Sequence, residues 1–507
     1  MRATALFLAC VLASSANAQR GSTATEQLVG RILLAEDRRD SAGTAFEQGK
    51  KTPDKRIQYI ARRAEARVRD PKFTKRDSIP GAPTLPAPPN YPDPAWRLRF
   101  RAITARSSCA ELRTALADSA WAVRMHAADV VGSTCAKDSV IVGTLRAWAT
   151  AQYTTTRARG EASWHPAAHA IVALARITPT DARTALPLLM TSTVPNVRAY
   201  AARAARFSSD TASLQHLAGD ANDNVKEAAI DALSSVAGHR GDDQYLAALD
   251  AKGYQAVRAA ARALKGSPRS GDISLAALHT ALRLRADSSE TSRDARQAVM
   301  ELLAEFATPA QVPELIPLAT DFDCEVANTA SAIIKKLHAN APPKCTPLPI
   351  TLPPDAVSLA LGREVRIRVT MADSSGGGSI VVRLRGDVAP IMAARILELA
   401  RSGYYNGLVW QRVEPDFVVQ GGGLGANEYV GNPRFIRDEL GTVPHVRGTV
   451  GMSTRGHDTG DGQWFFNLRD NRRLDADYTV FADVVEGIDV VDGILEGDVI
   501  ARMDVLP

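Results

Sequence analysis

The feature that most restricts the fold of this chain is a pattern of alanine-rich helical segments that recurs between residues 96 and 338. Each segment has a polar or turn-like start, then a valine, then small and apolar residues at helical spacing. The valines are Val123, Val197, Val225, Val257 and Val326. Where units follow one another directly the spacing is about 30 residues, and the two longer gaps each leave room for one more unit. This pattern predicts an α-solenoid, in which stacked helix pairs bury a continuous core.

Three less regular segments fit the same pattern. Two fill the long gaps, "WHPAAHAIVALARI" at 164–177 and "SRDARQAVMELLAEF" at 292–306, and a third, "PDKRIQYIARRAEARV" at 53–68, lies ahead of the others. With their paired amphipathic helices these segments resemble HEAT-type repeats. The resemblance implies an architecture only, which can serve as a plain scaffold or as a concave surface for a client or partner protein.

Two proline-rich segments divide the chain. "SIPGAPTLPAPPNYPDP" and "ANAPPKCTPLPITLPPD" can continue neither a helix nor a central strand. We therefore expect a signal peptide at 1–18, a HEAT-like helical segment at 19–77, a linker at 78–95, the solenoid at 96–338, a second linker at 339–356 and a final domain at 357–507. The prolines before Asp355 also predict that the fragment 350–507 folds without the solenoid.

The N-terminus has the pattern of a secretory signal peptide. Arg2 precedes an apolar run from Ala3 to Ala13, and Ala16-Asn17-Ala18 forms a small-x-small cleavage site before Gln19. No later segment has the ~18–20 consecutive apolar residues that are needed to span a bilayer. The sequence thus predicts a soluble, exported protein, either periplasmic or fully secreted.

Four cysteines lie beyond the signal peptide, and an oxidising compartment favours disulfides between them. Cys109 opens one predicted helix and Cys135 follows the next, so an antiparallel hairpin brings both to the same end. Cys324 opens a later helix, and the proline-containing return to Cys345 is long enough to run back along it. We therefore predict the pairs Cys109–Cys135 and Cys324–Cys345, each worth roughly 2–4 kcal/mol in the chain-entropy estimate.

Several other functions are disfavoured by the sequence. The net charge of +5 is small for 507 residues and its basic residues are interleaved with acids, so no nucleic-acid partner is expected. His165 and His169 stand four residues apart but lack the glutamate of H-E-x-x-H, which favours packing roles over zinc binding. "DANDN" at 220–224 lacks the glycine and distant glutamate of a calcium loop and reads as a turn and N-cap. No metal or cofactor is predicted.

The composition changes from about Gly362. "REVRIRVTMA" and "SIVVRLRG" alternate like strands, "APIMAARILELARSGYYNG" indicates a helix that ends at Gly403, and the short strands "LVWQRV", "FVVQGG", "GTVGMS", "QWFFNL" and "TVFADVV" follow. A short helix, "GIDVVDGIL", precedes the closing strand "DVIARMDVL". Many short strands with two helices predict a closed β-barrel that is capped by helices.

Three motifs in this region resemble a known family. "GYYNGLVWQRVEPDFVVQGG", "GMSTRGHDTGDGQWFFNL" and "LDADYTVFADVVEGIDVVD" are similar, in the same order and at suitable spacing, to the cyclophilin-type peptidyl-prolyl cis–trans isomerases. The resemblance covers about residues 357–507, the whole of such a domain. It implies a cyclophilin-like barrel after the solenoid, a folding-assistance role, and proline-containing segments of unfolded or exported proteins as partners.

The resemblance also implies roles for individual residues. Arg412 is the implied catalytic residue, and Gln420 braces this arginine and the substrate. The implied substrate cleft consists of Phe417, Val418, Ser453, Thr454, Gln463, Phe465, Leu474 and Tyr478, with Phe465 on the floor of the proline pocket. Arg473 stands where many eukaryotic members have tryptophan, which argues against strong cyclosporin binding, and Thr454 replaces a common asparagine.

The position of Arg412 in an otherwise apolar strand has a physical reason. Rotation about an X–Pro bond loses amide conjugation and faces a barrier of roughly 18–20 kcal/mol. In the twisted state the proline nitrogen accepts a hydrogen bond more readily, so a fixed guanidinium binds the transition state better than the ground state. Two alternatives stay open: Arg412 pairs with a surface acid, or the barrel binds proline-containing segments as a scaffold without turnover.

Overall fold

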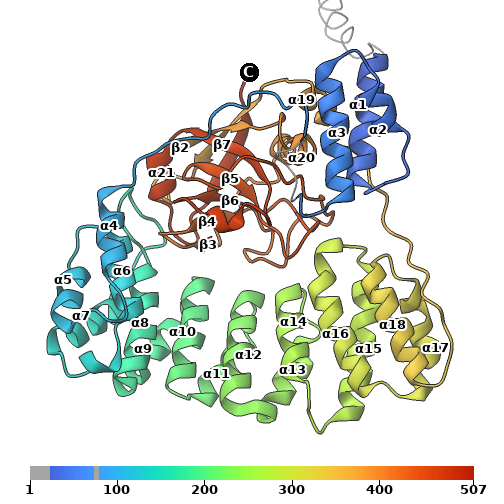
Figure 1. Ribbon diagram of the computed structural model, residues 1–507. Coiled ribbons are helices and arrows are strands. Elements are labelled where there is room, and N and C mark those ends of the chain that lie inside the picture. Colours follow the sequence, from blue (N-terminus) through green and yellow to red (C-terminus); the bar gives the residue numbers. More distant parts are fainter. Residues whose placement is uncertain (1–22, 74–78) are drawn as a thin grey trace, which may run out of the picture.

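The computed structural model describes residues 23–73 and 79–507, so the predicted signal peptide at 1–18 lies outside the described residues. A β-barrel formed by the C-terminal region occupies the centre of the molecule (Figure 1). Three N-terminal helices stand beside it, and a curved row of helices runs along another side. Within the described ranges, no helix has both the length and the apolar character needed to cross a membrane.

The curved row, called here the helical arc, extends from residue 95 to residue 336. Its α-helices are α4 (Ala95–Ala102), α5 (Cys109–Leu116), α6 (Trp121–Val130), α7 (Ser139–Thr150), α8 (His165–Ile177), α9 (Pro179–Met190), α10 (Pro195–Phe207), α11 (Thr211–Ala218), α12 (Asp223–Ala237), α13 (Asp242–Ala248), α14 (Tyr254–Ala263), α15 (Ser270–Ala286), α16 (Arg293–Phe306), α17 (Val312–Leu315) and α18 (Cys324–Lys336). The even-numbered helices from α6 to α18 each pack against the next one and form the inner layer.

The sequence pattern explains this stacking. All five repeat valines are buried at the start of an inner helix, and the two less regular units are the inner helices α8 and α16. Alanines along the inner helices, such as Ala201 and Ala229, are fully buried and let neighbouring helices approach closely. Asn222 caps α12 by accepting hydrogen bonds from the backbone amides of Asn224 and Val225, as the predicted turn requires.

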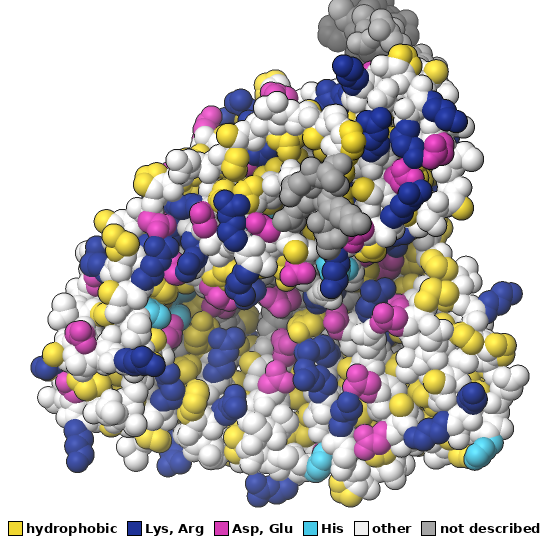
Figure 2. All heavy atoms as spheres, viewed as in Figure 1, with side chains coloured by type: hydrophobic (Ala, Val, Ile, Leu, Met, Phe, Trp, Pro, Cys, Tyr) yellow, Lys and Arg dark blue, Asp and Glu magenta, His cyan; other side chains and the backbone are white. Residues whose placement is uncertain are grey.

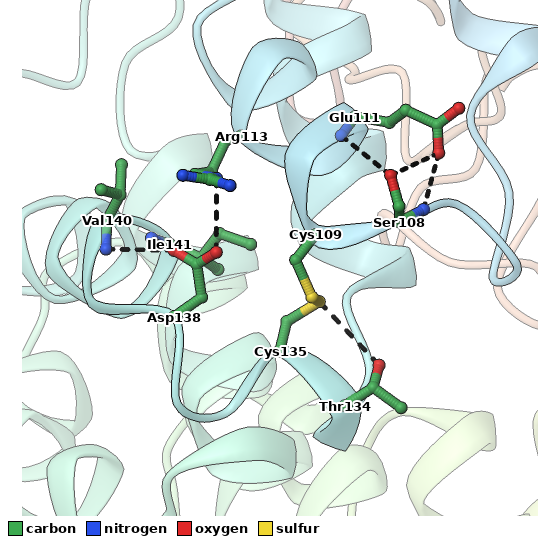
Figure 3. Close-up of a disulfide and its surroundings, with 9 residues drawn as sticks. All are labelled: Ser108, Cys109, Glu111, Arg113, Thr134, Cys135, Asp138, Val140 and Ile141. Carbon is green, nitrogen blue, oxygen red and sulfur yellow. Dashed lines mark hydrogen bonds and ion pairs between the residues drawn. A yellow bond between two sulfur atoms is a disulfide. The ribbon is translucent and has the colours of Figure 1, made fainter.

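Both predicted disulfides are present, at the two ends of the helical arc. Cys109 begins α5 and Cys135 ends the 3₁₀ helix η2 (Ser133–Cys135), with their Cα atoms 5.6 Å apart (Figure 3). Cys324 begins α18 and joins Cys345 on the returning segment, at a Cα separation of 5.0 Å. Next to the first disulfide, Arg113 of α5 forms an ion pair with Asp138, the N-cap of α7, at 3.3 Å. The terminal helices of the arc are therefore fastened locally.

The C-terminal region forms one antiparallel sheet that curls into a barrel. Its strands are β1 (Arg366–Met371), β2 (Ser379–Leu384), β3 (Arg412–Val413), β4 (Val418–Gly421), β5 (Thr449–Met452), β6 (Trp464–Asn467), β7 (Val480–Glu486) and β8 (Ile500–Val505). They lie in the order β3-β4-β6-β5-β7-β2-β1-β8. The predicted strand "LVWQRV" contributes only β3, and the residues before it close the barrel: the backbones of Leu408 and Trp410 bond to those of Ile500 and Asp498.

Helices cover the barrel at its open faces. They are α19 (Ala356–Ala360), α20 (Pro390–Arg401) and α21 (Ile488–Asp492). Helix α20 ends two residues before Gly403, whose φ of +73° fits the predicted stop. Inside the barrel, the ring of Trp410 lies 5.1 Å from that of Trp464 and 5.2 Å from that of Phe466. These large side chains fill the interior of the barrel.

The N-terminal helices belong to the same core as the barrel. They are α1 (Ala24–Asp37), α2 (Ala45–Lys50) and α3 (Lys55–Arg69). Their buried side chains, such as Ile32 and Ile57, form one apolar cluster with Leu359 of α19 and Leu397 of α20. The prediction that 350–507 folds without the solenoid took no account of these N-terminal helices. A proline-rich linker interrupts helices and strands, but it does not prevent the parts on either side from packing together.

The two proline-rich segments run along the surface of the molecule. The first passes over the barrel from α3 to α4 (Figure 1). Its Pro86 and Pro92 carbonyls accept hydrogen bonds of 3.1 Å from Arg385 and Arg447, and the Tyr91 hydroxyl donates to the Val484 carbonyl. The second returns from α18 to α19 beside the arc. The first proline-rich segment therefore covers part of a barrel that is formed by residues much later in the sequence.

Candidate active site

A small pocket opens on the barrel where β3, β4 and β6 meet the loop after β5. Its volume is about 130 Å³, well below the ~300–1,000 Å³ of a site for a whole small molecule. The pocket is lined by Arg412, Phe417, Val418, Gln420, Glu428, Ser453, Thr454, Arg455, Phe465, Leu474 and Tyr478. It therefore has room for one small side chain beside a guanidinium group.

Strand pairing brings the polar residues of the pocket together. Arg412 and Gln420 lie directly opposite each other in the antiparallel pair β3–β4, so their side chains share one face. The Gln420 side-chain oxygen accepts a hydrogen bond of 3.4 Å from Arg412 Nη1, and its nitrogen donates to Ser453 Oγ at 2.9 Å. Gln420 is buried, so this amide holds the guanidinium in a defined direction.

Two carboxylates also contact Arg412. Glu414 accepts from Arg412 Nε at 2.9 Å and pairs with its Nη2, while Glu428 lies 3.4 Å from Nη1. All three side chains are 40–48% exposed. Exposed ion pairs contribute only about 0–1 kcal/mol, so a substrate can replace these contacts at little cost. The alternative of a surface ion pair thus describes contacts that Arg412 makes in addition to its contact with Gln420.

The floor of the pocket is apolar. Phe465, Val418 and Leu474 form a buried cluster against which Phe417 and Tyr478 pack. A side chain at Gly451, opposite Phe465 in the β5–β6 pair, would clash with the Phe465 ring, so glycine is required there. On its other side, Phe465 stacks at 6.0 Å on the buried ring of His445. A flat apolar group that enters the pocket therefore meets a ring that is packed against its neighbours.

Gln463 does not line this pocket, although the resemblance assigned it to the cleft. It follows Gly462, which has a φ of +88°, and its side chain turns toward the loop after β4. There its amide donates to the Glu428 carbonyl at 3.1 Å and accepts from Gln411 at 2.7 Å. Gln463 therefore supports the pocket rim from behind.

The part of the chain that contains this pocket is similar to known proteins. Residues 367–505 match the family described as "Cyclophilin type peptidyl-prolyl cis-trans isomerase/CLD". A Helicobacter pylori peptidyl-prolyl cis-trans isomerase is 37% identical over 127 residues, which cover 24% of this chain and 78% of that protein. The chain belongs to the cyclophilin-type peptidyl-prolyl cis–trans isomerases.

Two further similarities cover comparable shares of the chain. A peptidyl-prolyl cis-trans isomerase of Acinetobacter baylyi is 36% identical over 125 residues, or 23% of this chain and 66% of that protein. A crystal structure of a Cryptosporidium parvum cyclophilin, in the presence of the dipeptide Ala-Pro, covers 28% of this chain and 99% of its own, with 18% identity and a TM-score of 0.26. The family match at 367–505 does not extend over the N-terminal helices or the helical arc.

Sequence reasoning missed two residues of the cyclophilin pocket, Glu428 and Arg455. Arg455 directly follows the motif residue Thr454 and is 12% exposed. It donates to Asp461 of the barrel at 3.0 Å, but also to Asp294 of α16 at 2.7 Å and to the Thr291 hydroxyl in η4 (Glu290–Ser292) at 3.0 Å. The partners from the arc lie about 160 residues away in sequence, so no local pattern reveals them.

His165 and His169, which stand four residues apart as zinc ligands often do, both make structural contacts. His165 is buried, stacks on Trp164 and lies 2.8 Å from the Glu496 carbonyl, which joins α8 to the barrel. Burial lowers the pKa of His165 to about 3, so this side chain is neutral. His169 instead pairs with Asp129 at 2.7 Å.

Proposed function

We propose that this chain isomerises X–Pro bonds in exported polypeptides and that Arg412 is its catalytic residue. The proline ring of the substrate enters the apolar pocket above Phe465. The Arg412 guanidinium faces the proline nitrogen and the neighbouring carbonyl as the acyl side rotates. No bond is made or broken, so this mechanism needs neither a nucleophile nor a proton transfer.

The catalytic step follows from a difference in hydrogen bonding. In the planar ground state the proline nitrogen shares its lone pair with the carbonyl and accepts hydrogen bonds poorly. In the twisted state the lone pair is localised, and a donor that is already in position stabilises it without reorganisation. Gln420 supplies that positioning through its two hydrogen bonds, one to Arg412 and one to Ser453. The binding is thus differential, as catalysis requires.

One observation carries this proposal. A guanidinium that is held by a buried amide lines a pocket whose floor is a closely packed phenylalanine. The pocket holds the proline ring of the substrate in place. The guanidinium stabilises the proline nitrogen, whose lone pair becomes localised as the bond twists. The same residues line a volume of about 130 Å³, too small for a larger ligand.

The test is the exchange rate of an Ala-Ala-Pro-Phe peptide, measured by NMR exchange spectroscopy. Arg412→Ala should lower kcat/KM by about 10²–10³, the usual cost of losing one preorganised donor. Arg412→Lys should also be poor, because an ammonium group does not reproduce the planar fork. Phe465→Ala should weaken both binding and turnover.

Arg473→Ala is the matched control for these variants. This second arginine stacks on Phe417 at 4.4 Å but does not line the pocket, so its removal should change the rate little. Circular dichroism checks that each variant is folded. A folded Arg412→Ala protein with nearly full activity would refute the mechanism, and an inactive wild type that still binds the peptide would favour the scaffold without turnover.

We also propose that the protein acts outside the cytoplasm and assists folding there. Its two disulfides support an oxidising compartment. Mass spectrometry of the protein from its host should find the N-terminus at Gln19 and four cysteines that resist alkylation. A mature chain that keeps Met1, or that carries free thiols, would overturn this part of the proposal.

A further inference from the structure

A second, larger cavity lies between the helical arc and the barrel. Its volume is about 920 Å³, and it extends from α10 and α12 to the barrel residues near Val409 and Gly497. Figure 2 shows charged side chains in columns along the inner helices on this side of the molecule. We call this cavity the arc groove.

The arc groove joins the proline pocket. Arg412 and Glu428 line both cavities, so the catalytic guanidinium stands at the boundary between them. A polypeptide whose proline occupies the small pocket must continue in at least one direction past Arg412. The groove is the adjoining space, and its size matches several residues of chain, whereas the pocket fits a single ring.

Hydrogen bonds fix the arc wall of the groove relative to the barrel. Asn196 and Tyr200 of α10 donate to the two Glu496 carboxylate oxygens at 3.0 and 2.9 Å. Asn224 of α12 donates to the Gly425 carbonyl at 2.9 Å and accepts from Asn427 at 3.0 Å. The groove is therefore formed before a substrate arrives, and binding there needs no movement of the arc.

The lining of the groove suits a polypeptide. On α10 it presents the exposed Arg203, Arg206 and Phe207, and on α12 it presents Glu227 and Asp231. Burial, with a smaller contribution from the nearby Asp231, raises the pKa of Glu227 to about 7. Carboxylates on both the arc side and the barrel side of the groove oppose the binding of nucleic acid, and the charged groups on both sides oppose a lipid tail. Mixed charges, amides and one exposed aromatic ring match the mixed chemistry of a peptide.

We propose that the arc groove binds the part of a client polypeptide that flanks the target proline, so that α10 and α12 supply one wall of an extended substrate site. This inference rests on the proposed function of the proline pocket. It assigns to the arc a direct contact with substrate, beyond its role in holding the barrel. Residues on α10 and α12 then determine which clients are preferred.

The test compares two peptides with the full-length protein. One is Ala-Ala-Pro-Phe, and the other carries the same motif between unstructured polar extensions, with further versions that keep one extension only. Arg206→Glu reverses an exposed charge in the groove, and Ala228→Trp fills the groove from α12. Both variants should raise KM about tenfold for the extended peptide, leave its kcat unchanged and leave the tetrapeptide unaffected.

Arg262→Glu is the matched control. Arg262 lies on the neighbouring inner helix α14, is exposed as Arg206 is, and faces Asp231 as Arg206 does, but it does not line the groove. It should leave both peptides unchanged. Because Ala228 is partly buried and its variant could unfold, Arg206→Glu with a melting curve decides alone.

The outcomes separate the two proposals. If the folded groove variants process the extended peptide like the wild type, the groove inference is wrong and the proline pocket is unaffected. If the tetrapeptide is not isomerised by the wild type, the proposed function itself fails. If the control behaves like Arg206→Glu, general charge explains the effect and the groove inference is overturned.

Discussion

Ile32 and Ile57 of the N-terminal helices lie in one apolar core with the barrel, whereas the helical arc keeps an apolar core of its own. Among the described residues, no side chain of the arc belongs to the barrel core. The arc instead meets the barrel through polar contacts, including buried Arg97, which donates to Pro415 and Leu468 carbonyls, and Arg157, which pairs with Asp498.

The difference between the two contacts has a physical meaning. Apolar burial is non-directional and makes the helices and the barrel one folding unit. Hydrogen bonds and ion pairs depend on distance and angle, so they set the position of the arc without merging the two cores. The shared apolar core is suited to α1–α3 if these helices stabilise the barrel. The directional contacts are suited to the helical arc, because they hold it at a fixed distance from Arg412 and leave the arc groove open.

The largest expected effect comes from removing the N-terminal helices. The fragment 350–507 should lose cooperative unfolding, because it exposes the barrel face that contacts side chains such as Ile32, Leu33 and Ile57. Each such burial contributes ~1.5–3 kcal/mol, so a few of them approach the whole stability of a domain. The fragment 96–338, with its own core, should melt cooperatively. Calorimetry of both fragments checks this, and a sharp transition for 350–507 would break the comparison.

Replacing a single buried arginine of the shared core should lower the free energy of unfolding more than replacing an exposed arginine of the arc. Arg67 of α3 is 2% exposed, pairs with Glu36 at 2.8 Å and donates to the carbonyls of Leu440 and Val388. Arg67→Met leaves a carboxylate buried without its partner and should lower the free energy of unfolding by about 3–5 kcal/mol.

The control for Arg67 lies in the arc. Arg146→Met removes a pair whose arginine is 56% exposed and should cost less than about 1 kcal/mol. Urea unfolding of both variants measures the two values. Equal losses would show that the shared core is no more sensitive than the surface of the arc.

The shared core should also respond to pH. Burial, together with Glu36, raises the pKa of Glu439 from 4.5 to about 7. A raised carboxyl pKa adds stability that is complete below about 4.5 and is lost as the pH rises through about 7. The melting temperature should therefore fall between pH 5 and pH 8 more in the wild type than in Glu439→Gln. The glutamine keeps an acceptor for the Met392 amide, which Glu439 now binds at 2.7 Å.

Asp37 and Asp438 titrate in the same direction, since burial raises both pKa values to about 6. The Gln variant should therefore keep part of the wild-type slope. Identical slopes in the two proteins would remove Glu439 from the explanation.

A smaller effect than that of Arg67→Met should come from the contact between the arc and the barrel. Asn224→Ala removes the hydrogen bonds to Gly425 and Asn427, and neutral hydrogen bonds of this kind contribute about 0.5–1.5 kcal/mol each. The tetrapeptide rate should stay unchanged, because Asn224 does not line the proline pocket. Thermal melting and the exchange assay together check the prediction, and a loss as large as that of Arg67→Met would contradict the distinction between the two contacts.

The sequence predicted those residues of the pocket that lie close together along the chain. Arg412 and Gln420 lie opposite each other in a tight strand pair, so one short motif contains both. The inner helices followed from buried valines at repeated positions. Glu428 and Arg455 were missed because their neighbours come from irregular loops and from the arc. The packing of α1–α3 against the barrel was not predicted. The sequence of an amphipathic helix indicates that it has an apolar face, but it does not indicate which element that face packs against.

The path of the chain around the barrel has a consequence for the order in which the protein is made. Arg67 donates a hydrogen bond to the carbonyl of Leu440, which lies 373 residues further along the chain. The two disulfides of the arc, in contrast, join residues that are only 26 and 21 positions apart. Synthesis from the N-terminus completes the arc while α1–α3 still expose their apolar faces. The first helices to be made are thus among the last to pack, and their apolar faces stay exposed to aggregation during most of synthesis.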